Sequence, residues 1–198
     1  MSPRPDVSEE RRHQILNAAE GVFSEKGFDQ ARMEDIAEET GLSKGTLYLY
    51  FKGKDDLIIA ILDRIFQYEF KEMEKLVEAD HPALDSIRQF TELAIKDISN
   101  MLRLLPIAYE FLALAFRNRY VQRAFKMYFN RYLDILVPIV QRGIDAGEFR
   151  PVDAIEVAVA AGAIFEGTIL LWVYDKSRVD PARHIRAGIG LLLAGIQA

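Results

Sequence analysis

The sequence predicts an all-α protein of about nine helices, and three observations support this fold class. Apolar residues recur at the helical spacing along most of the 198-residue chain, and the alternating pattern of a half-buried strand is missing. Glycines follow several of these periodic segments, where helix C-termini favour them. Serine, aspartate and proline precede several others. We expect a three-helix domain over residues 1–54 and a larger helical domain over residues 55–198.

Each expected helix is bounded by residues that favour helix ends. Serine and aspartate cap N-termini, acidic residues suit the first turn, and glycine suits the residue after the last turn. Proline fits the first helical position. In chain order, the helices and the residues that mark their ends are 8–26 (Ser8, Gly27), 33–40 (Gly41), 43–51 (Ser43, Gly53), 54–78 (Asp55, Asp56), 83–104 (Asp80, Pro82), 106–116 (Pro106), 120–146 (Gly147), 151–175 (Pro151, Asp153) and 180–196 (Asp180, Pro181).

Composition excludes several classes of function. The chain has no cysteine, so disulfides and thiolate metal sites are excluded and a reducing cytoplasm suits it. No run reaches about 18 uninterrupted apolar residues, because Glu166 breaks the most apolar segment, 157–173, and we expect no membrane partner. The three histidines are isolated, and no phosphate loop or metal-ligand spacing occurs. We therefore expect no catalytic site, no metal and no cofactor in a cytoplasmic protein.

Residues 35–51 are the most informative segment and read Asp-Ile-Ala-Glu-Glu-Thr-Gly-Leu-Ser-Lys-Gly-Thr-Leu-Tyr-Leu-Tyr-Phe. A short helix, a tight turn at Gly41 and a second short helix form the layout of a helix-turn-helix DNA reader. Leu47 and Phe51, four residues apart, are expected to face inward. An ordinary helical hairpin is the alternative, but it leaves exposed tyrosines beside lysines unexplained. The expected outer face consists of Lys44, Thr46, Tyr48 and Tyr50.

The charge of the chain does not by itself indicate DNA binding. The net charge is −5, and residues 1–54 carry eight Lys and Arg against ten Asp and Glu. DNA binding requires a positive face rather than a positive total. Residues 40–54 contain three lysines and no acid, so the second short helix can approach phosphate.

The first ~55 residues resemble the TetR family of bacterial transcriptional repressors. The resemblance implies a three-helix DNA-binding domain followed by a variable helical domain that dimerises and binds a small-molecule effector. Beyond these residues it rests on the number and length of the helices. The motifs that carry it are 15–28, which ends in Phe-Ser-Glu-Lys-Gly-Phe, then Asp35-Ile36-Ala37, the run 41–51, and Lys54.

The resemblance also implies which residues contact DNA. The chain departs from the family pattern at Ala31-Arg32, where a threonine or serine is usual, and at Leu49, where some members have a tyrosine. We expect Arg32 to replace the missing hydroxyl as a charged contact, and Lys54 to hold a phosphate. The expected DNA-binding residues are Arg32, Met33, Ser43, Lys44, Gly45, Thr46, Tyr48, Tyr50 and Lys54.

The last two helices are candidates for a dimer interface. Residues 157–173 are apolar nearly all round, and a helix that is apolar on every side is buried on every side. A central core helix is the alternative, and the family resemblance favours the homodimer. The expected interface residues are Ala158, Gly162, Ile169, Ile185, Ile189, Leu192 and Ile196.

Aromatic residues between the fifth and eighth helices supply enough surface to line an apolar effector pocket, although most of them are expected to fill the core. Glu110 and Glu166 each interrupt an apolar run, and a buried carboxylate needs a partner. A cationic ligand is one such partner; an arginine such as Arg117 or Arg119, or simple exposure, is the other. The pocket candidates are Phe90, Met101, Tyr109, Glu110, Phe125, Tyr128, Phe129, Phe165, Glu166 and Trp172.

These patterns lead to one hypothesis and one alternative. The hypothesis is a ligand-responsive transcriptional repressor that binds a palindromic operator in double-stranded DNA as a homodimer. A small apolar or cationic effector would release it by changing the spacing of the two reading helices. The alternative is a helical small-molecule carrier or scaffold protein that does not touch DNA.

Overall fold

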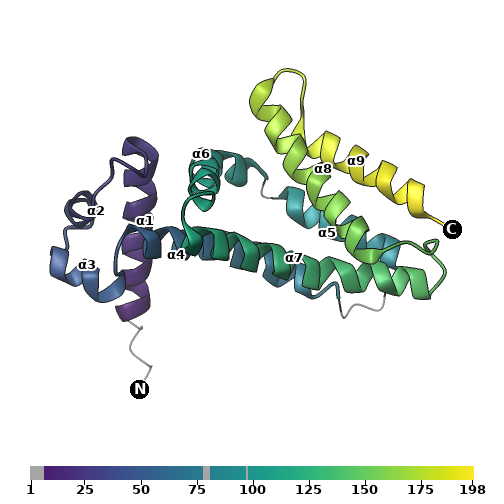
Figure 1. The fold of residues 1–198 in the computed structure, drawn as a ribbon, viewed down its shortest axis with the longest axis horizontal. Coiled ribbons are helices and arrows are strands. Elements are labelled where there is room, and N and C mark those ends of the chain that lie inside the picture. The colour runs from purple at the N-terminus through teal and green to yellow at the C-terminus, as the bar shows by residue number, and fades with distance from the viewer. Residues whose placement is uncertain (1–6, 78–80, 97) are drawn as a thin grey trace. The chain divides into compact units, whose positions relative to one another are not determined.

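The computed structural model describes residues 7–77, 81–96 and 98–198, and this part of the chain is helical (Figure 1). The all-α prediction is confirmed, since the described residues form nine helices and no strand. A single antiparallel bridge joins Phe149 to Gln197. The helices are α1 (Val7–Lys26), α2 (Met33–Thr40), α3 (Lys44–Tyr50), α4 (Lys54–Glu74), α5 (Ala83–Lys96), α6 (Ile98–Ala115), α7 (Arg119–Asp145), α8 (Ala154–Tyr174) and α9 (Pro181–Ile196).

The helices divide into two compact units. The first combines residues 1–66 with residues 103–127, so it contains α1 to α3, the start of α4, most of α6 and the start of α7. The second combines residues 67–102 with residues 128–198. The unit that carries the helix-turn-helix therefore extends beyond residue 54 and recruits a segment about 50 residues further along the chain.

An aromatic cluster organises the core of the first unit. Phe23 of α1 and Phe28 of the following turn meet edge to face with 5.4 Å between their ring centroids. Phe111 of α6 lies 6.2 Å from each of them, also edge to face. All three are almost fully buried, as are Ile15 and Leu47. Edge-to-face packing of this kind fixes α6 against the α1–α2 turn.

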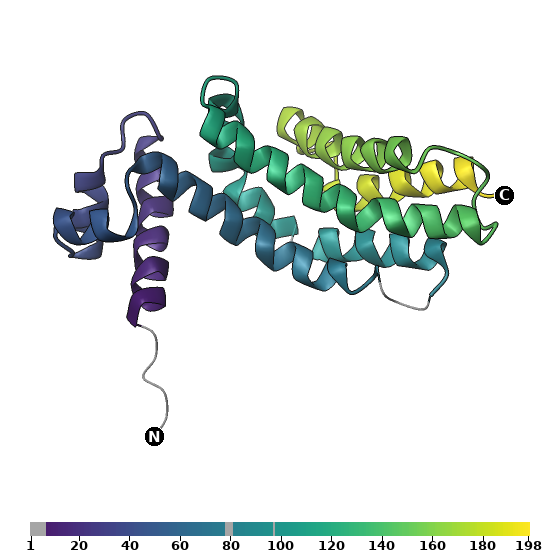
Figure 2. The same ribbon diagram turned by 60° about the horizontal axis from the view of Figure 1, so that its bottom comes forward.

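In the second unit, α8 and α9 run side by side, as both views show (Figure 2). Asp153 caps α8 and Asp180 caps α9, each by accepting backbone N–H groups, and Pro181 stands at the first turn of α9. Gly143 is a point of close approach, because an added Cβ would lie 2.4 Å from the ring of Phe149. By length and apolar composition alone, α8 is long enough to cross a membrane, but it is a helix of this packed unit.

The predicted boundary between the fifth and sixth helices was wrong. We expected a break at Pro106, whereas α5 ends at Lys96, α6 begins at Ile98, and Pro106 lies inside α6. An interior proline removes one helical hydrogen bond and strains the turn before it. Burial of Ile107 and Phe111 on the same helix offsets that cost. The fourth helix is also shorter than expected, since it ends at Glu74.

Candidate DNA-binding site

The turn between α2 and α3 has the geometry that its sequence predicts. Gly41 adopts φ +66° and ψ 17°, a left-handed conformation that glycine reaches without strain. Leu42 then donates its N–H to Ala37 O at 3.1 Å. Ser43 caps α3 by accepting the N–H of Thr46 at 3.1 Å. The angle between α2 and α3 is therefore fixed by local hydrogen bonds as well as by the buried Leu47.

The exposed face of α3 differs from the one expected. Lys44, Gly45, Tyr48 and Leu49 are exposed, while Thr46 and Tyr50 are half-buried. The Thr46 hydroxyl lies 2.8 Å from Ser43 Oγ. The expected set included 46, 48 and 50, which is the period of a strand. A helix advances 100° per residue, so positions i, i+1, i+4 and i+5 share a face.

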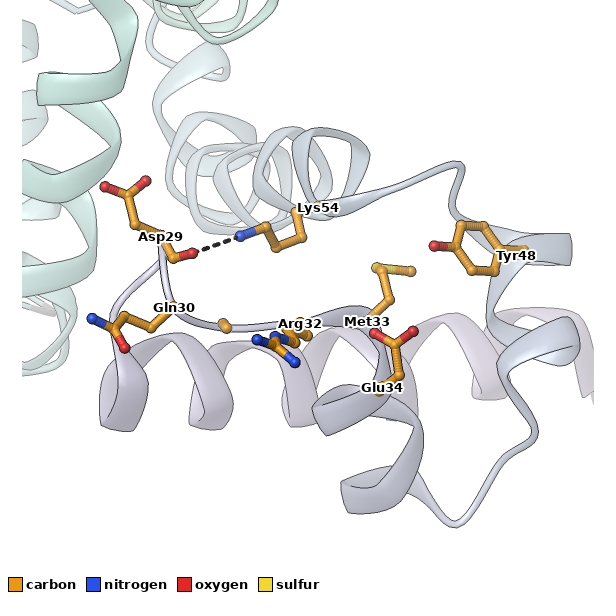
Figure 3. Close-up of a pocket in the computed structure, with 8 residues that line it drawn as sticks. Asp29, Gln30, Arg32, Met33, Glu34, Tyr48 and Lys54 are labelled. Atoms are coloured by element: carbon orange, nitrogen blue, oxygen red, sulfur yellow. Dashed lines mark hydrogen bonds between the residues drawn. The ribbon is translucent and has the colours of Figure 1, made fainter.

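An open hollow lies beside this face in the same unit (Figure 3). Lys54 reaches into it from the start of α4 and donates to Phe28 O at 2.6 Å and Asp29 O at 3.4 Å. Its ammonium group also lies 4.4 Å from the ring centroid of Phe28. The residues lining the hollow are Asp29, Gln30, Ala31, Arg32, Met33, Glu34, Tyr48 and Lys54.

The hollow brings together four of the residues expected to bind DNA, namely Arg32, Met33, Tyr48 and Lys54, and they differ in exposure. Arg32 and Tyr48 are exposed, whereas Met33 is only 6% exposed and is chiefly a core residue. Lys54 uses two of its donors on the turn and has a third to offer. The hollow therefore brings two cationic groups and the Tyr48 hydroxyl together with two opposing carboxylates, those of Asp29 and Glu34.

Lys44 is held by an ion pair across the two helices. Its ammonium group bonds to the Glu34 carboxylate of α2 and lies 5.9 Å from the ring centroid of Tyr48. The hydrogen bond to Glu34 raises the pKa of Lys44, and the same bond lowers the pKa of Glu34. Both side chains are more than half exposed, so water screens the attraction strongly. The pair orients Lys44 without removing it from solvent.

The start of α2 has a cap that the sequence analysis missed. Asp35 accepts the backbone N–H of Arg32, the residue that precedes α2, at 2.7 Å, which is the bond that the third helical residue makes in a capping box. Asp35 also pairs with Lys26 at 2.9 Å, which lowers the pKa of its carboxyl. An acid at the third helical position is the sequence signal for such a cap.

Glu110 faces a partner that neither alternative anticipated. Its Oε1 accepts the backbone N–H of Phe28 at 2.6 Å, so neither a ligand nor an arginine is needed to explain it. The other carboxylate, Glu166, is exposed at the surface of α8, although nearby protein atoms raise the pKa of its carboxyl by desolvation. Exposure to solvent was one of the alternatives for Glu166.

The structure does not gather the ten pocket candidates in one unit. Tyr109, Glu110 and Phe125 belong to the first unit, and the other seven belong to the second. There, Phe90 and Phe129 lie 6.0 Å and 6.1 Å from the ring of Tyr132, which was not among the candidates. The Tyr132 hydroxyl donates to Ala158 O at 2.7 Å, and burial raises its pKa. The remaining candidates of the second unit are Met101, Tyr128, Phe165, Glu166 and Trp172.

The expected interface stripe lies largely inside the second unit. Five of its seven residues are buried within the single chain, and Gly162 and Leu192 are half-buried. The prediction that the buried five form a surface for a partner is therefore corrected, because neighbouring helices of the same chain cover their side chains. They are Ala158, Ile169, Ile185, Ile189 and Ile196.

Comparison with known proteins identifies the family of the chain. The family model for bacterial regulatory proteins of the tetR family matches residues 15–61, and the model for the C-terminal domain of BetI-type transcriptional repressors matches residues 84–190. The HTH-type transcriptional regulator YfiR of Bacillus subtilis, itself uncharacterised, is 31% identical over 163 residues, which are 77% of this chain and 75% of that protein.

Two solved structures share the fold along almost the whole chain. SmeT, the repressor of the Stenotrophomonas maltophilia multidrug efflux pump SmeDEF, has a TM-score of 0.78 at 24% identity and covers 94% of this chain and 90% of its own. FadR of Bacillus subtilis in complex with stearoyl-CoA has a TM-score of 0.69 at 26% identity, covering 93% and 99%.

The fold and the site together define a helix-turn-helix DNA-binding protein. The two family models cover both units, and the C-terminal model alone matches more than half of the chain. The chain belongs to the TetR family of bacterial transcriptional regulators. Proteins of this family are regulators and in general not enzymes, and the prediction of a DNA-binding regulator is confirmed.

Proposed function

We propose that the protein is a dimeric, ligand-responsive repressor that reads a palindromic DNA operator with α3. The observation that carries the proposal is the exposed face of α3, where Lys44, Gly45, Tyr48 and Leu49 stand together with no acidic residue among them. A helix with such a face, set behind a fixed turn, fits the major groove. A regulator that acts on an operator works in the cytoplasm, where the DNA is.

Backbone contacts would come from the groups around this face. Lys44 and Tyr48 on the exposed face of α3, together with Lys54 and Arg32 of the hollow, would bind phosphates. Ser43 and Gly45 lie at the start of α3, where a close approach to the DNA backbone is unobstructed. Thr46 and Tyr50 contribute less to contact than the sequence suggested, because both are half-buried.

The outer faces of α8 and α9 support a homodimer. Only 28% of the apolar window in α8 is buried within the single chain, although its composition is that of a buried helix. Large apolar side chains remain exposed there: Ile155, Val159, Leu170, Leu171, Val173 and Tyr174 of α8, and Leu191 of α9. A second copy of the same surface would cover them in an isologous interface. Two α3 helices would then read half-sites ~34 to 36 Å apart, or a multiple of this spacing.

A small, largely apolar effector fits the second unit best. The aromatic group of Phe90, Tyr132 and Phe129 offers an apolar contact surface, and the relative solved with stearoyl-CoA binds a molecule with a long apolar chain. Binding would favour one spacing of the two α3 helices over another, which requires a differential affinity of a few kcal/mol.

A DNA-binding measurement tests the proposal. Fluorescence anisotropy with the DNA upstream of the protein's own gene should show specific binding by wild type and loss of binding by Lys44→Ala. Lys96→Ala, which removes an exposed lysine of the second unit, is the matched control and should bind normally. If each subunit neutralises ~4 to 5 phosphates, log K should fall with log salt at a slope of about −7 to −9. No specific binding by wild type would favour the carrier or scaffold alternative, and equal binding by all three proteins would show that Lys44 does not contact the DNA.

A further inference from the structure

Leu49 is an exposed leucine that the fold does not use. Its side chain is 84% exposed in the middle of the exposed face of α3. Among the described residues between 8 and 51, the large hydrophobic side chains that lie exposed are those of Leu49 and its neighbour Tyr48, and Tyr48 also carries a polar hydroxyl. Every other leucine, isoleucine, valine or phenylalanine in this range packs at least partly into the core. Neither packing nor capping accounts for a leucine at this position.

The neighbour of Leu49 on this face has no side chain. Gly45 lies one turn earlier on the same face of α3, so no side chain stands next to Leu49 on that side. The fold does not demand glycine at position 45, because an added Cβ would meet only Ser43 Oγ, at 3.8 Å. The missing side chain leaves open space beside the leucine on the surface that meets DNA.

The chemistry of leucine leaves one base-specific partner in a major groove. Leucine has neither a donor nor an acceptor, so it makes no hydrogen bond to a base edge. The groove displays polar groups from every base pair, and the C5-methyl group of thymine is the apolar exception. Lys44 and Tyr48, on the same face, are polar and suit the phosphate walls on either side.

We propose that Leu49 packs against the methyl group of one thymine in each half-site and is a specificity-determining residue of this regulator. The inference rests on the proposed operator binding and predicts one base pair of the operator. Both half-sites carry an A·T pair at the symmetric position that Leu49 contacts. Leu49 is therefore the source of an apolar contact, where the sequence comparison suggested only the loss of a tyrosine.

Deoxyuridine provides the test, because it lacks only the methyl group of thymine. Duplexes selected by the full-length wild-type protein from random-sequence DNA give the operator, and each symmetric thymine pair is then replaced by deoxyuridine. Burial of one methyl group is worth ~0.8 kcal/mol. At the position under Leu49, replacing thymine by deoxyuridine should therefore weaken binding about fourfold in one half-site and about fifteenfold in both.

The same duplexes are bound to Leu49→Ala, with Leu112→Ala, an exposed leucine of α6, as the matched control. Leu49→Ala should bind thymine and deoxyuridine duplexes equally, while Leu112→Ala should keep the fifteenfold difference. An unchanged melting temperature shows that Leu49→Ala folds. If no thymine pair responds, or Leu49→Ala responds as wild type does, Leu49 does not read thymine. If wild type selects no duplex at all, the proposed operator binding fails, and this inference fails with it.

Discussion

The hydrogen bond between Glu110 and Phe28 allows a sharp test of how α6 supports the DNA-binding unit. Glu110→Ala removes the acceptor and leaves the backbone N–H of Phe28 unpaired. Phe28 is only 6% exposed. An unsatisfied buried donor costs about 1–3 kcal/mol. We expect the free energy of unfolding in urea to fall by this amount. Glu110→Gln retains a carbonyl acceptor of the same length and should lose less than half as much.

The loss should also reach the DNA-binding surface. Phe28 is bonded on both sides, since its N–H donates to Glu110 and its C=O accepts from Lys54 at 2.6 Å. A turn released from Glu110 holds Lys54 less firmly, so operator affinity should fall in Glu110→Ala and recover in Glu110→Gln. Amide hydrogen exchange at Phe28, followed by NMR, reports the bond directly. Unchanged exchange and stability in Glu110→Ala would refute the role of this carboxylate.

Three further predictions concern charge, assembly and packing. Glu34→Gln frees Lys44 from its ion pair and should strengthen binding to non-operator DNA, up to about fivefold, by anisotropy; weaker binding would contradict the competition between Glu34 and phosphate. Val159→Glu puts a charge on the exposed apolar face of α8 and should give monomers in sedimentation analysis, whereas a persistent dimer would place the interface elsewhere. Gly143→Ala drives a Cβ into the adjacent aromatic ring and should destabilise the protein by about 1–3 kcal/mol in thermal unfolding, while Gly21→Ala, with nothing within 4 Å, should not.

Local signals in the sequence predicted much of the fold. Gly41 and Ser43 fix the turn and the start of α3 through bonds that span at most five residues, and Asp180-Pro181 marks the start of α9 in the same way. The sequence around Pro106 does not distinguish a helix start from a helix interior, because proline occurs in both. What decides between them is the burial of neighbouring side chains, which depends on the rest of the chain.

The contacts that sequence reasoning missed are long-range or depend on facing direction. Glu110 and Phe28 are 82 residues apart, and no local pattern pairs them. A stripe such as Ile185 and Ile189 has the same spacing whether it faces its own chain or a partner. The structure shows that this stripe faces inward, and that Leu191 is a large apolar residue of α9 that lies exposed. On α3, the helical period alone would have placed Leu49 on the outer face beside Gly45.

The ion pair of Lys44 bears on how an acidic chain discriminates between DNA sequences. With a net charge of −5, the protein is not attracted to DNA as a whole, and Glu34 already occupies the lysine best placed for phosphate. A phosphate must therefore replace Glu34 before it gains Lys44, so a loose electrostatic encounter is worth little. When α3 docks in the groove, phosphate replaces Glu34 at Lys44, and Tyr48 and Leu49 make their own contacts at the same time. Those contacts require a close fit in the groove. Affinity then depends more on the uncharged contacts, and these are the ones that distinguish an operator from other DNA.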